Sequence, residues 1–386
     1  MMAITAAALL TPYERIDKAL LLVDGGKVVE VASREKRELP VACRRFDFPD
    51  SVLAPAYLDI HIHGGMGHDV MEPNRDGLTR LEAFLATQGV VAYLPTTVTA
   101  SEDHILHSLE WLAGTIEAAA SRPPGKRARP LGVQLEGPFI SHAKRGVHPP
   151  EHIVPPTLDR FERYWQAARG HIKIITIAPE VEGAMEVIAE ASRRGVCCSL
   201  GHSDCDLRGA RAAVAAGARH ATHTFNAMRP LDHRHPGLLG AVLTDGTVTA
   251  DIIPDGIHVD PTVVSLFLKA KGSQAAVLIT DAISATGMPE GRYRLGSFEV
   301  EVQGNQCISG GKLAGSVLRM DQAVRNVMQF AGRSLQESVR LASANPAAVI
   351  GEKSKGVLIP GADADISVLS AQGEVQKTII GGCFSE

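Results

Sequence analysis

The middle of the chain repeats one pattern, in which a short apolar run precedes a stretch of helical composition. Ala-, Glu- and Arg-rich segments such as 183–194 and 207–216 separate most of the runs, as amphipathic helices would. The apolar runs are 56–63, 90–99, 132–136, 172–179, 196–202, 220–226, 248–254 and 276–281. Strands that alternate with helices predict a parallel sheet with crossover connections. Eight such units match a TIM-like (β/α)8 barrel of the α/β class, and an open doubly wound sheet is the alternative.

Both ends of the chain follow a different pattern, with β-like runs and turns but no helical stretch between them. Asp24-Gly25-Gly26 separates two such runs, which indicates a hairpin. Because the termini of a domain commonly lie close together, we expect a small β-sandwich domain formed by residues 1–54 and 355–386. The barrel would then span 55–354, with an inserted Gly-rich hairpin at 293–313.

Composition narrows the class of protein. The chain is 45% hydrophobic and 21% charged, so it can form a large core. Its net charge of −4 and the lack of a basic run argue against a nucleic-acid partner. We expect neither a signal peptide nor a membrane span, since the apolar start is short and every apolar run is below 18 residues. Six cysteines without a CxxC pair favour a reduced cytoplasmic protein.

Polar residues gather at the C-terminal ends of the predicted strands. In a barrel these ends form one face, where active sites are built. His61 and His63 lie at positions i and i+2 of the first strand, so both imidazoles point to the same side and can bind one metal ion. A pair of buried structural histidines is the alternative.

Glu136, His202 and His223 end three further strands, and the last two of these strands are consecutive. Two imidazoles and one carboxylate leave a coordination position open for water, as in catalytic metal sites. Asp281 ends the eighth strand, where it can act as general base and then general acid, or simply cap the following segment. No G-x-S-x-G motif occurs, which disfavours a serine nucleophile.

The order of short motifs resembles the N-acetylglucosamine-6-phosphate deacetylase family of the amidohydrolase superfamily. The matching segments, from residue 55 to 316, read PAYLDIHIHGG, LEGPF, KRGVHPPEH, APE, GHS, THTFNAM, PGLLGAVL, DGIHVD, TDA and LAGS. The HxH and TDA segments are common to the superfamily, whereas LEGPF, THTFNAM and DGIHVD in this order are much more specific. The resemblance covers nearly the whole chain from about residue 50.

The resemblance implies a role for each matching residue. Glu136, His202 and His223 would bind the main catalytic ion, zinc or Fe(II), and His61 and His63 a second ion that only some members bind. Asp281 would shuttle the proton. Contacts with the substrate are implied for Val147, His148, Asn226, Ala227, Arg234, His258, Leu313, Ala314 and Gly315. Among these, His148 would also polarise the carbonyl group.

The resemblance further implies a homodimer, because in the family the arginine can reach the substrate of a neighbouring subunit. Arg234 is our choice for this phosphate contact, with Arg229 and His235 as the alternatives in the same basic stretch. The expected reaction removes the acetyl group from N-acetylglucosamine 6-phosphate. The galactosamine epimer is an alternative substrate, since one hydroxyl distinguishes the two sugars.

Two other functions fit the sequence less well. An amidohydrolase acting on a cyclic amide usually needs a lysine at the end of a middle strand, where this chain has Ala178-Pro179-Glu180. A non-catalytic sugar-phosphate sensor would have no need for the complete set of Glu136, the histidines and Asp281. Acetate release and metal analysis distinguish these functions.

Overall fold

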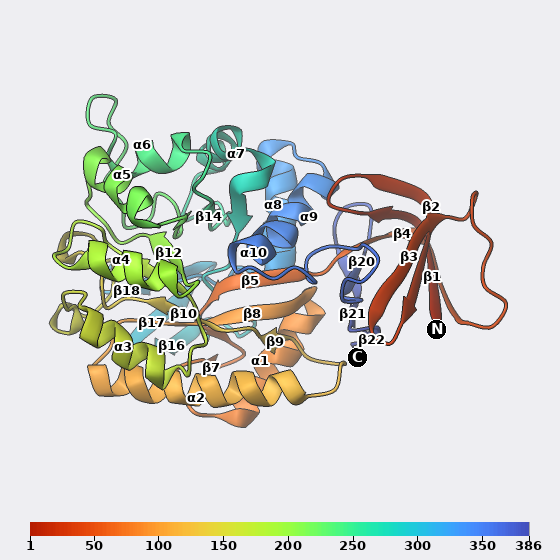
Figure 1. Cartoon of the computed structure of the whole chain (residues 1–386), viewed down its shortest axis with the longest axis horizontal. Coiled ribbons are helices and arrows are strands. Elements are labelled where there is room, and N and C mark those ends of the chain that lie inside the picture. Colours follow the sequence, from red (N-terminus) through yellow and green to blue (C-terminus); the bar gives the residue numbers. More distant parts are fainter. Residues whose placement is uncertain (386) are drawn as a thin grey trace.

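The computed structural model describes residues 1–385, in which eight short parallel strands form the centre of a barrel (Figure 1). The strands are β5 (Tyr57–Ile62), β8 (Val90–Thr97), β10 (Val133–Glu136), β11 (Ile172–Ile177), β12 (Cys197–Leu200), β13 (His220–Ala221), β14 (Ala250–Ile252) and β15 (Ala276–Leu278). The first six pair in chain order, and β14 pairs with β15. Each lies within one of the eight runs predicted from the sequence.

Backbone hydrogen bonds close the barrel at its two remaining seams. Between β13 and β14, Thr249 N donates to Arg219 O (2.9 Å) and Thr224 N donates to Asp251 O (2.8 Å). After β15, Asp281 N donates to His61 O (2.9 Å), so the last strand returns to the first. The TIM-like barrel expected from the sequence is therefore confirmed, and an open sheet is excluded.

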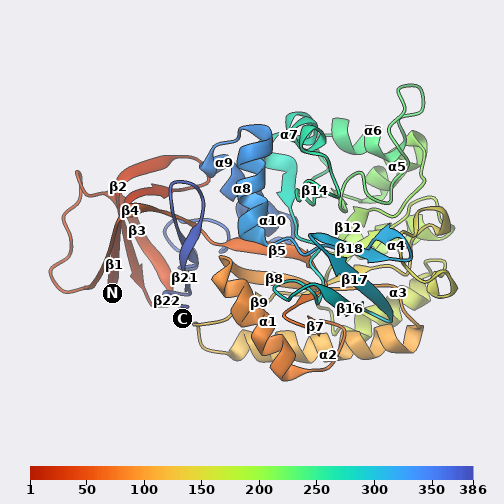
Figure 2. The same cartoon turned by 180° about the vertical axis from the view of Figure 1, so that it is seen from behind.

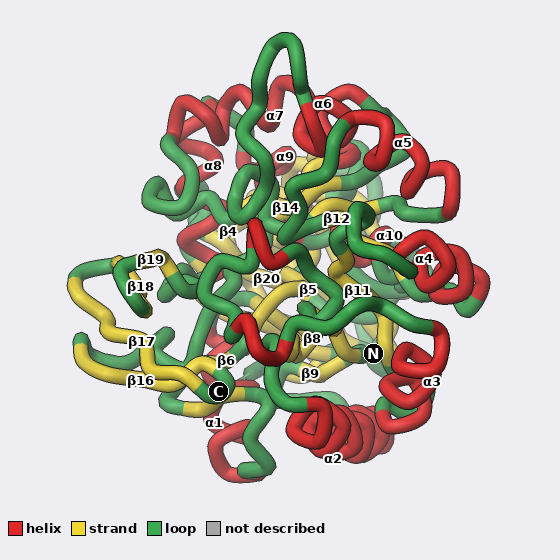
Figure 3. The backbone as a smooth tube through the Cα atoms, turned by 90° about the vertical axis from the view of Figure 1, so that its left-hand side faces the viewer, coloured by secondary structure: helices red, strands yellow, loops and turns green. Residues whose placement is uncertain are grey.

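Helices surround the strands (Figure 3). They are α1 (Arg75–Thr87), α2 (Glu102–Ser121), α3 (Leu158–Ala167), α4 (Ala184–Arg193), α5 (Leu207–Ala216), α6 (Gly237–Thr244), α7 (Pro261–Ala275), α8 (Met320–Ala331), α9 (Leu335–Ala342) and α10 (Ala344–Val349). In α2 the Ser101 side chain caps the first turn by accepting from His104 N, and the buried residues follow the helical repeat. None of the helices within residues 1–385 is long and apolar enough to cross a membrane.

Both ends of the chain form one seven-stranded sheet beside the barrel. In spatial order its strands are β22 (Cys383–Phe384), β21 (Val375–Ile380), β20 (Ile366–Leu369), β4 (Arg44–Pro55), β1 (Met2–Leu10), β2 (Arg15–Asp24) and β3 (Lys27–Ser33). A separate hydrophobic core contains residues from both halves of this sheet, including Leu21 and Val368. The expected sandwich is thus a single sheet with its own core, and the exact boundaries at 54/55 and 354/355 stay predictions.

The predicted hairpin joins β2 to β3. Asp24 pairs with Lys27, so Gly25 and Gly26 form a two-residue loop with φ of 54° and 78°. Both values lie in the left-handed region that glycine adopts without steric cost, as a type I′ turn requires.

The strand β4 leads almost directly into β5, so the barrel strands begin near the small sheet and end away from it. At that far end lies a four-stranded antiparallel sheet, the predicted insertion (Figure 2). It consists of β16 (Gly291–Leu295), β17 (Phe298–Gln303), β18 (Gln306–Ser309) and β19 (Lys312–Leu313). The remaining short strands are β6 (Gly64–Gly65), β7 (His68–Asp69) and β9 (Arg129–Pro130), and single 3-10 turns cover His142–Lys144 and Pro150–His152.

Candidate functional site

The polar strand ends converge on one cavity of about 170 Å³ at the far end of the barrel. His63, Glu136, His202, His223 and Asp281 all line it and are all buried. These side chains come from strands that are distant in sequence, which is the convergence that the sequence predicts.

Three of these residues have an unusual backbone conformation. His202, His223 and Asp281 have φ of 47°, 31° and 51°, where non-glycine residues are uncommon. They lie two, two and three residues after the ends of β12, β13 and β15, and all three line the cavity. Such positions cost of order 1–3 kcal/mol each and cluster at functional sites.

One group of possible ligand atoms surrounds Glu136 Oε1. This oxygen lies 3.2 Å from His202 Nε2 and 3.0 Å from His223 Nε2, and the two nitrogens lie 3.0 Å apart. Ligand atoms bound to one tetrahedral zinc ion at 2.0–2.1 Å lie about 3.3 Å from one another. The three atoms are therefore spaced almost as one ion needs them.

A second group lies at the other carboxylate oxygen. His61 Nε2 and His63 Nε2 are 3.2 Å apart, and Asp281 Oδ1 lies 3.4 Å and 3.0 Å from them. Glu136 Oε2 is 3.6 Å from the first nitrogen and 3.3 Å from the second. Glu136 thus stands between the two groups and offers one oxygen to each.

The protonation of the histidines indicates that the site suits a cation. The Nδ1 atoms of His202 and His63 lie 2.9 Å and 3.0 Å from the carbonyl oxygens of Lys144 and Thr96. A carbonyl oxygen only accepts, so each Nδ1 carries a hydrogen and each Nε2 is the atom that faces the carboxylate oxygens. Nitrogen and carboxylate oxygen atoms this close together favour a cation between them. These residues therefore fit the divalent ion that the resemblance implies.

The pKa shifts of His63 and Asp281 also indicate a site that suits a cation. Burial alone would lower the pKa of His63, but the carboxylates of Asp281 and Glu136 outweigh it and raise that pKa well above its ordinary value. Burial would raise the pKa of Asp281, but His61 and His63 lower it to about 2. The site stabilises positive charge strongly, as a metal centre must.

His148 is held as a hydrogen-bond donor at the wall of the cavity. Thr99 N lies 3.2 Å from His148 Nδ1, and Thr99 Oγ1 lies 2.7 Å from it. A backbone N–H only donates, so Nδ1 accepts and the hydrogen of the neutral ring is on Nε2. Burial, followed by the charge of His202, lowers the pKa of His148 to about 3, which keeps the ring neutral.

The remaining predicted contact residues also line the cavity, with one exception. They are Val147, Asn226, Ala227, His258, Leu313, Ala314 and Gly315. His258 is oriented by Asp255, whose Oδ2 lies 2.6 Å from its Nδ1. The insertion contributes Leu295 and Phe298, so it covers one side of the cavity.

Arg234 is the exception, because it lies in an exposed loop and does not line the cavity of its own chain. Of the alternatives, Arg229 forms an ion pair with Asp204 (2.9 Å), and His235 is exposed. The choice of Arg234 therefore stays a prediction that concerns a second subunit.

Three buried residues that support the site were missing from the sequence prediction. Thr99 holds His148, Gln134 Nε2 lies 2.8 Å from His61 Nδ1, and Asp251 accepts from the backbone N–H of His223. Each is a polar residue within or just after an apolar strand, and this position is the sequence feature that could have indicated a role in the site. Asp251 also lies 2.9 Å from His220 Nε2.

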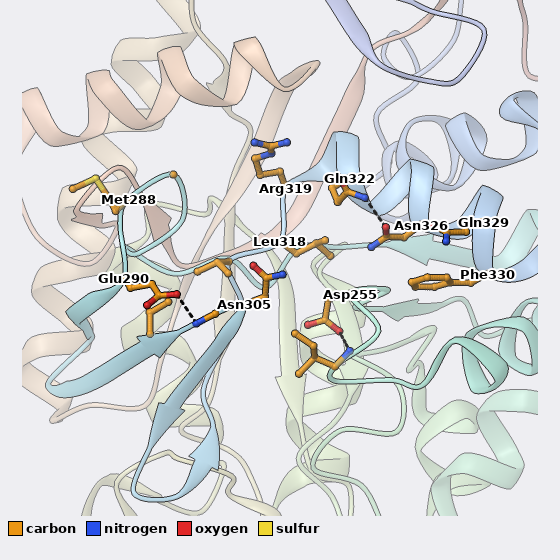
Figure 4. A pocket seen from close by; sticks show the side chains of 15 residues that line it. Asp255, Met288, Glu290, Asn305, Leu318, Arg319, Gln322, Asn326, Gln329 and Phe330 are labelled. Carbon is orange, nitrogen blue, oxygen red and sulfur yellow. Dashed lines mark hydrogen bonds between the residues drawn. The ribbon is translucent and has the colours of Figure 1, made fainter.

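Figure 4 shows a larger cavity of about 560 Å³, whose lining includes Asp255, the hydrogen-bond partner of His258. It is lined by the loops around Asp255 and Met288 and by α8, where Gln322 donates to Asn326 (2.6 Å). No histidine lines it among the described residues, and its acids, Asp255 and Glu290, come from separate loops. It therefore lacks the ligand set of the smaller cavity.

Comparison with known proteins is consistent with this geometry. Residues 52–383 match the model of the Amidohydrolase family. N-acetylglucosamine-6-phosphate deacetylase of Homo sapiens is 39% identical over 94% of this chain and 90% of that protein. N-acetylgalactosamine-6-phosphate deacetylase of Escherichia coli O157:H7 is 36% identical over 98% of this chain and 97% of that protein.

A solved structure is similar along the whole chain. It is a mutant N-acetyl-D-glucosamine-6-phosphate deacetylase from Mycobacterium smegmatis, in complex with N-acetyl-D-glucosamine-6-phosphate. It is 32% identical with a TM-score of 0.92, and the match covers 99% of this chain and 98% of that one.

Proposed function

Because the chain belongs to the amidohydrolase family, we propose that it hydrolyses the acetamide of N-acetylglucosamine 6-phosphate to glucosamine 6-phosphate and acetate. The observation that carries this proposal is the buried set of Glu136, His202 and His223 within reach of Asp281, in one cavity. The similarity to the human and mycobacterial deacetylases supports the choice of substrate.

Glu136, His202 and His223 would hold one divalent ion, zinc or Fe(II), and His61 with His63 a second. Such an ion supplies Lewis acidity that activates water and polarises a carbonyl oxygen. The N/O ligand set suits both metals.

The chain's own groups perform the proton transfers. The Asp281 carboxylate accepts a proton from the attacking water, whose oxygen bonds to the acetyl carbon. The Nε2–H of His148 donates a hydrogen bond to the carbonyl oxygen, where negative charge develops. Asp281 then gives its proton to the amide nitrogen, the C–N bond breaks, and the amine and acetate leave.

The sugar phosphate would be bound by Val147, Asn226, Ala227, His258 and the Leu313–Gly315 segment, which all line the cavity. Arg234 would reach the phosphate from the other subunit of a homodimer and donate charge-assisted hydrogen bonds. Binding energy from this remote phosphate orients the amide for attack. All six cysteines are unpaired, which supports a reducing compartment, the cytoplasm.

The test is acetate release from N-acetylglucosamine 6-phosphate and from its galactosamine epimer, with metal analysis of the same sample. We expect kcat/KM to be higher for the glucosamine substrate. A preference for the epimer would instead favour the alternative that the E. coli relative suggests. If neither sugar released acetate and a cyclic amide were hydrolysed, the proposal would be wrong.

A further inference from the structure

Gln134 contacts His61 of the second group of possible metal ligands, at the ring nitrogen Nδ1 and not at Nε2, which would bind the ion. It lies on β10, two residues before Glu136, so both side chains point into the barrel. Its Nε2 lies 2.8 Å from His61 Nδ1, and it is 1% exposed. Its Oε1 is also buried and has no hydrogen-bond partner.

This contact differs from the one that holds His63. A backbone carbonyl fixes the tautomer of His63, because it can only accept. A glutamine amide has a donor at one end and an acceptor at the other, in nearly the same shape. Rotation of the Gln134 amide by 180° therefore changes the partner of His61 without changing the packing.

The two orientations have opposite consequences for His61. With the amide nitrogen toward it, Nδ1 accepts and the neutral ring carries its hydrogen on Nε2. That hydrogen lies among His63 Nε2, Asp281 Oδ1 and Glu136 Oε2, which are 3.2 Å, 3.4 Å and 3.6 Å from His61 Nε2. It occupies the space that an ion would need. With the amide oxygen toward it, Nδ1 donates and the lone pair of Nε2 is free to bind a cation.

The orientation with the oxygen toward His61 gives the buried oxygen a hydrogen bond and leaves the amide nitrogen at the position where the oxygen had no partner, so each orientation leaves one end of the amide unpaired. The oxygen accepts this hydrogen bond only when the hydrogen of His61 moves from Nε2 to Nδ1. Binding of a cation at Nε2 and rotation of the amide are thus coupled.

We propose that Gln134 is a positioning residue that selects the tautomer of His61 and thereby sets the affinity of the His61, His63 and Asp281 group for a second divalent ion. This rests on the proposed metal centre, but not on the identity of the substrate. The first group, at Glu136, His202 and His223, has no contact with Gln134 among the described interactions and is expected to be insensitive to it.

The experiment is a Zn²⁺ titration of the full chain by equilibrium dialysis, with metal-to-protein ratios determined by mass spectrometry. Gln134→Glu offers only acceptors and should tighten the second ion about 10-fold. Gln134→Met has a similar volume but no acceptor of comparable strength, and should weaken the second ion about 10- to 100-fold, as loss of such a partner does. The first ion should bind equally in both variants.

Thr176→Val is the matched control, because Thr176 is a buried barrel residue whose hydroxyl contacts Thr222 and no site histidine. It should leave both affinities unchanged. Nitrogen-15 NMR of the wild type should show the His61 hydrogen moving from Nε2 to Nδ1 as the second ion binds, which tests the proposal even if Gln134→Met fails to fold.

Second-ion affinities within twofold of one another in wild type, Gln134→Glu and Gln134→Met would overturn the proposal. Equal weakening of both ions would do the same, since it would indicate general damage to the barrel. Failure of the substrate assignment is distinguishable, because it would abolish acetate release and leave these metal affinities as expected.

Discussion

At the scale of single residues, the site depends on a few side chains whose hydrogen positions are set by their neighbours. Lys144 and Thr96 present carbonyl oxygens to His202 and His63, and Thr99 presents an N–H to His148. The first two histidines are thereby prepared as ligands and the third as a donor. Histidines thus acquire different chemical roles because their backbone hydrogen-bond partners differ.

Asp281→Asn should reduce kcat by about 10²- to 10⁴-fold, because an amide cannot take the proton of the attacking water. Acetate release measures the loss, and metal analysis should still find the first ion, since Asp281 belongs to the second group. Turnover at the wild-type rate would refute its role as proton shuttle.

Glu136→Gln should lower the occupancy of both ions, because one carboxylate faces both groups of ligands. His202→Gln serves as the comparison and should lower the occupancy of the first ion only. Metal analysis after dialysis checks both variants, and full occupancy in Glu136→Gln would remove this residue from the ligand set.

His68 does not line the cavity, but it makes the stability of the fold depend on pH. Burial, followed by the charge of Arg80, lowers its folded-state pKa to about 4, against about 6.5 in an unfolded chain. Between these values the unfolded state binds a proton that the folded state does not, so stability falls as pH falls from about 6.5 to about 4.

We therefore expect the free energy of unfolding to drop over this range by about 2–3 kcal/mol more in wild type than in His68→Met. Urea unfolding at pH 7 and pH 4 measures the difference. His107→Met, at an exposed position, is the control and should keep the wild-type dependence. The same slope in wild type and in His68→Met would contradict the assignment.

At the scale of elements, the barrel strands were predictable because their apolar runs are bounded by turns and separated by helical segments. The residues at the strand ends were predictable because parallel strands bring their C-terminal ends to one face. Thr99, Gln134 and Asp251 were not, because their roles depend on which neighbouring strand they face. Arg234 was chosen by resemblance, and its own chain gives it no contact with the cavity.

The turn after β10 illustrates how an element sets a catalytic side chain. Gly137 has φ of +71°, and a Cβ there would lie 2.0 Å from Thr99 Oγ1. Gly137→Ala should therefore destabilise the fold by about 2–4 kcal/mol, which combines the backbone cost with the clash. Displacing Thr99 should also disturb His148 and lower kcat at least about 10-fold.

Gly195→Ala separates the backbone cost from the cost of the clash, because Gly195 has φ of +80° but nothing lies within 4 Å of its Cβ position. This control should lose about 1 kcal/mol of stability and no activity. Thermal unfolding and acetate release check both variants. Equal kcat in the two would show that Thr99 does not need its present position.

At the scale of the whole molecule, Arg234 is exposed and does not line the cavity of its own chain, which is why we propose that it acts on the phosphate of a second subunit. Arg234→Ala should raise KM for the phosphorylated substrate about 10- to 100-fold, and much less for the unphosphorylated sugar. Equal changes for both sugars would remove Arg234 from the phosphate site.

Mixing two variants tests whether Arg234 acts on the substrate of the partner subunit. In a heterodimer of Arg234→Ala and Asp281→Asn subunits, one cavity would have its own Asp281 and the partner's Arg234. Co-refolded mixtures should therefore show a population of sites with wild-type KM. Activity equal to the sum of the separate variants would mean that the arginine acts within its own chain.

The small sheet joins the beginning of the chain to its end. Leu53 of β4 pairs with Val368 of β20, more than three hundred residues later. During synthesis the edge of β4 that pairs with β20 therefore has no hydrogen-bond partner until β20 has been synthesised. We expect a chain shortened to lack β20 to β22 to expose that edge and therefore to self-associate.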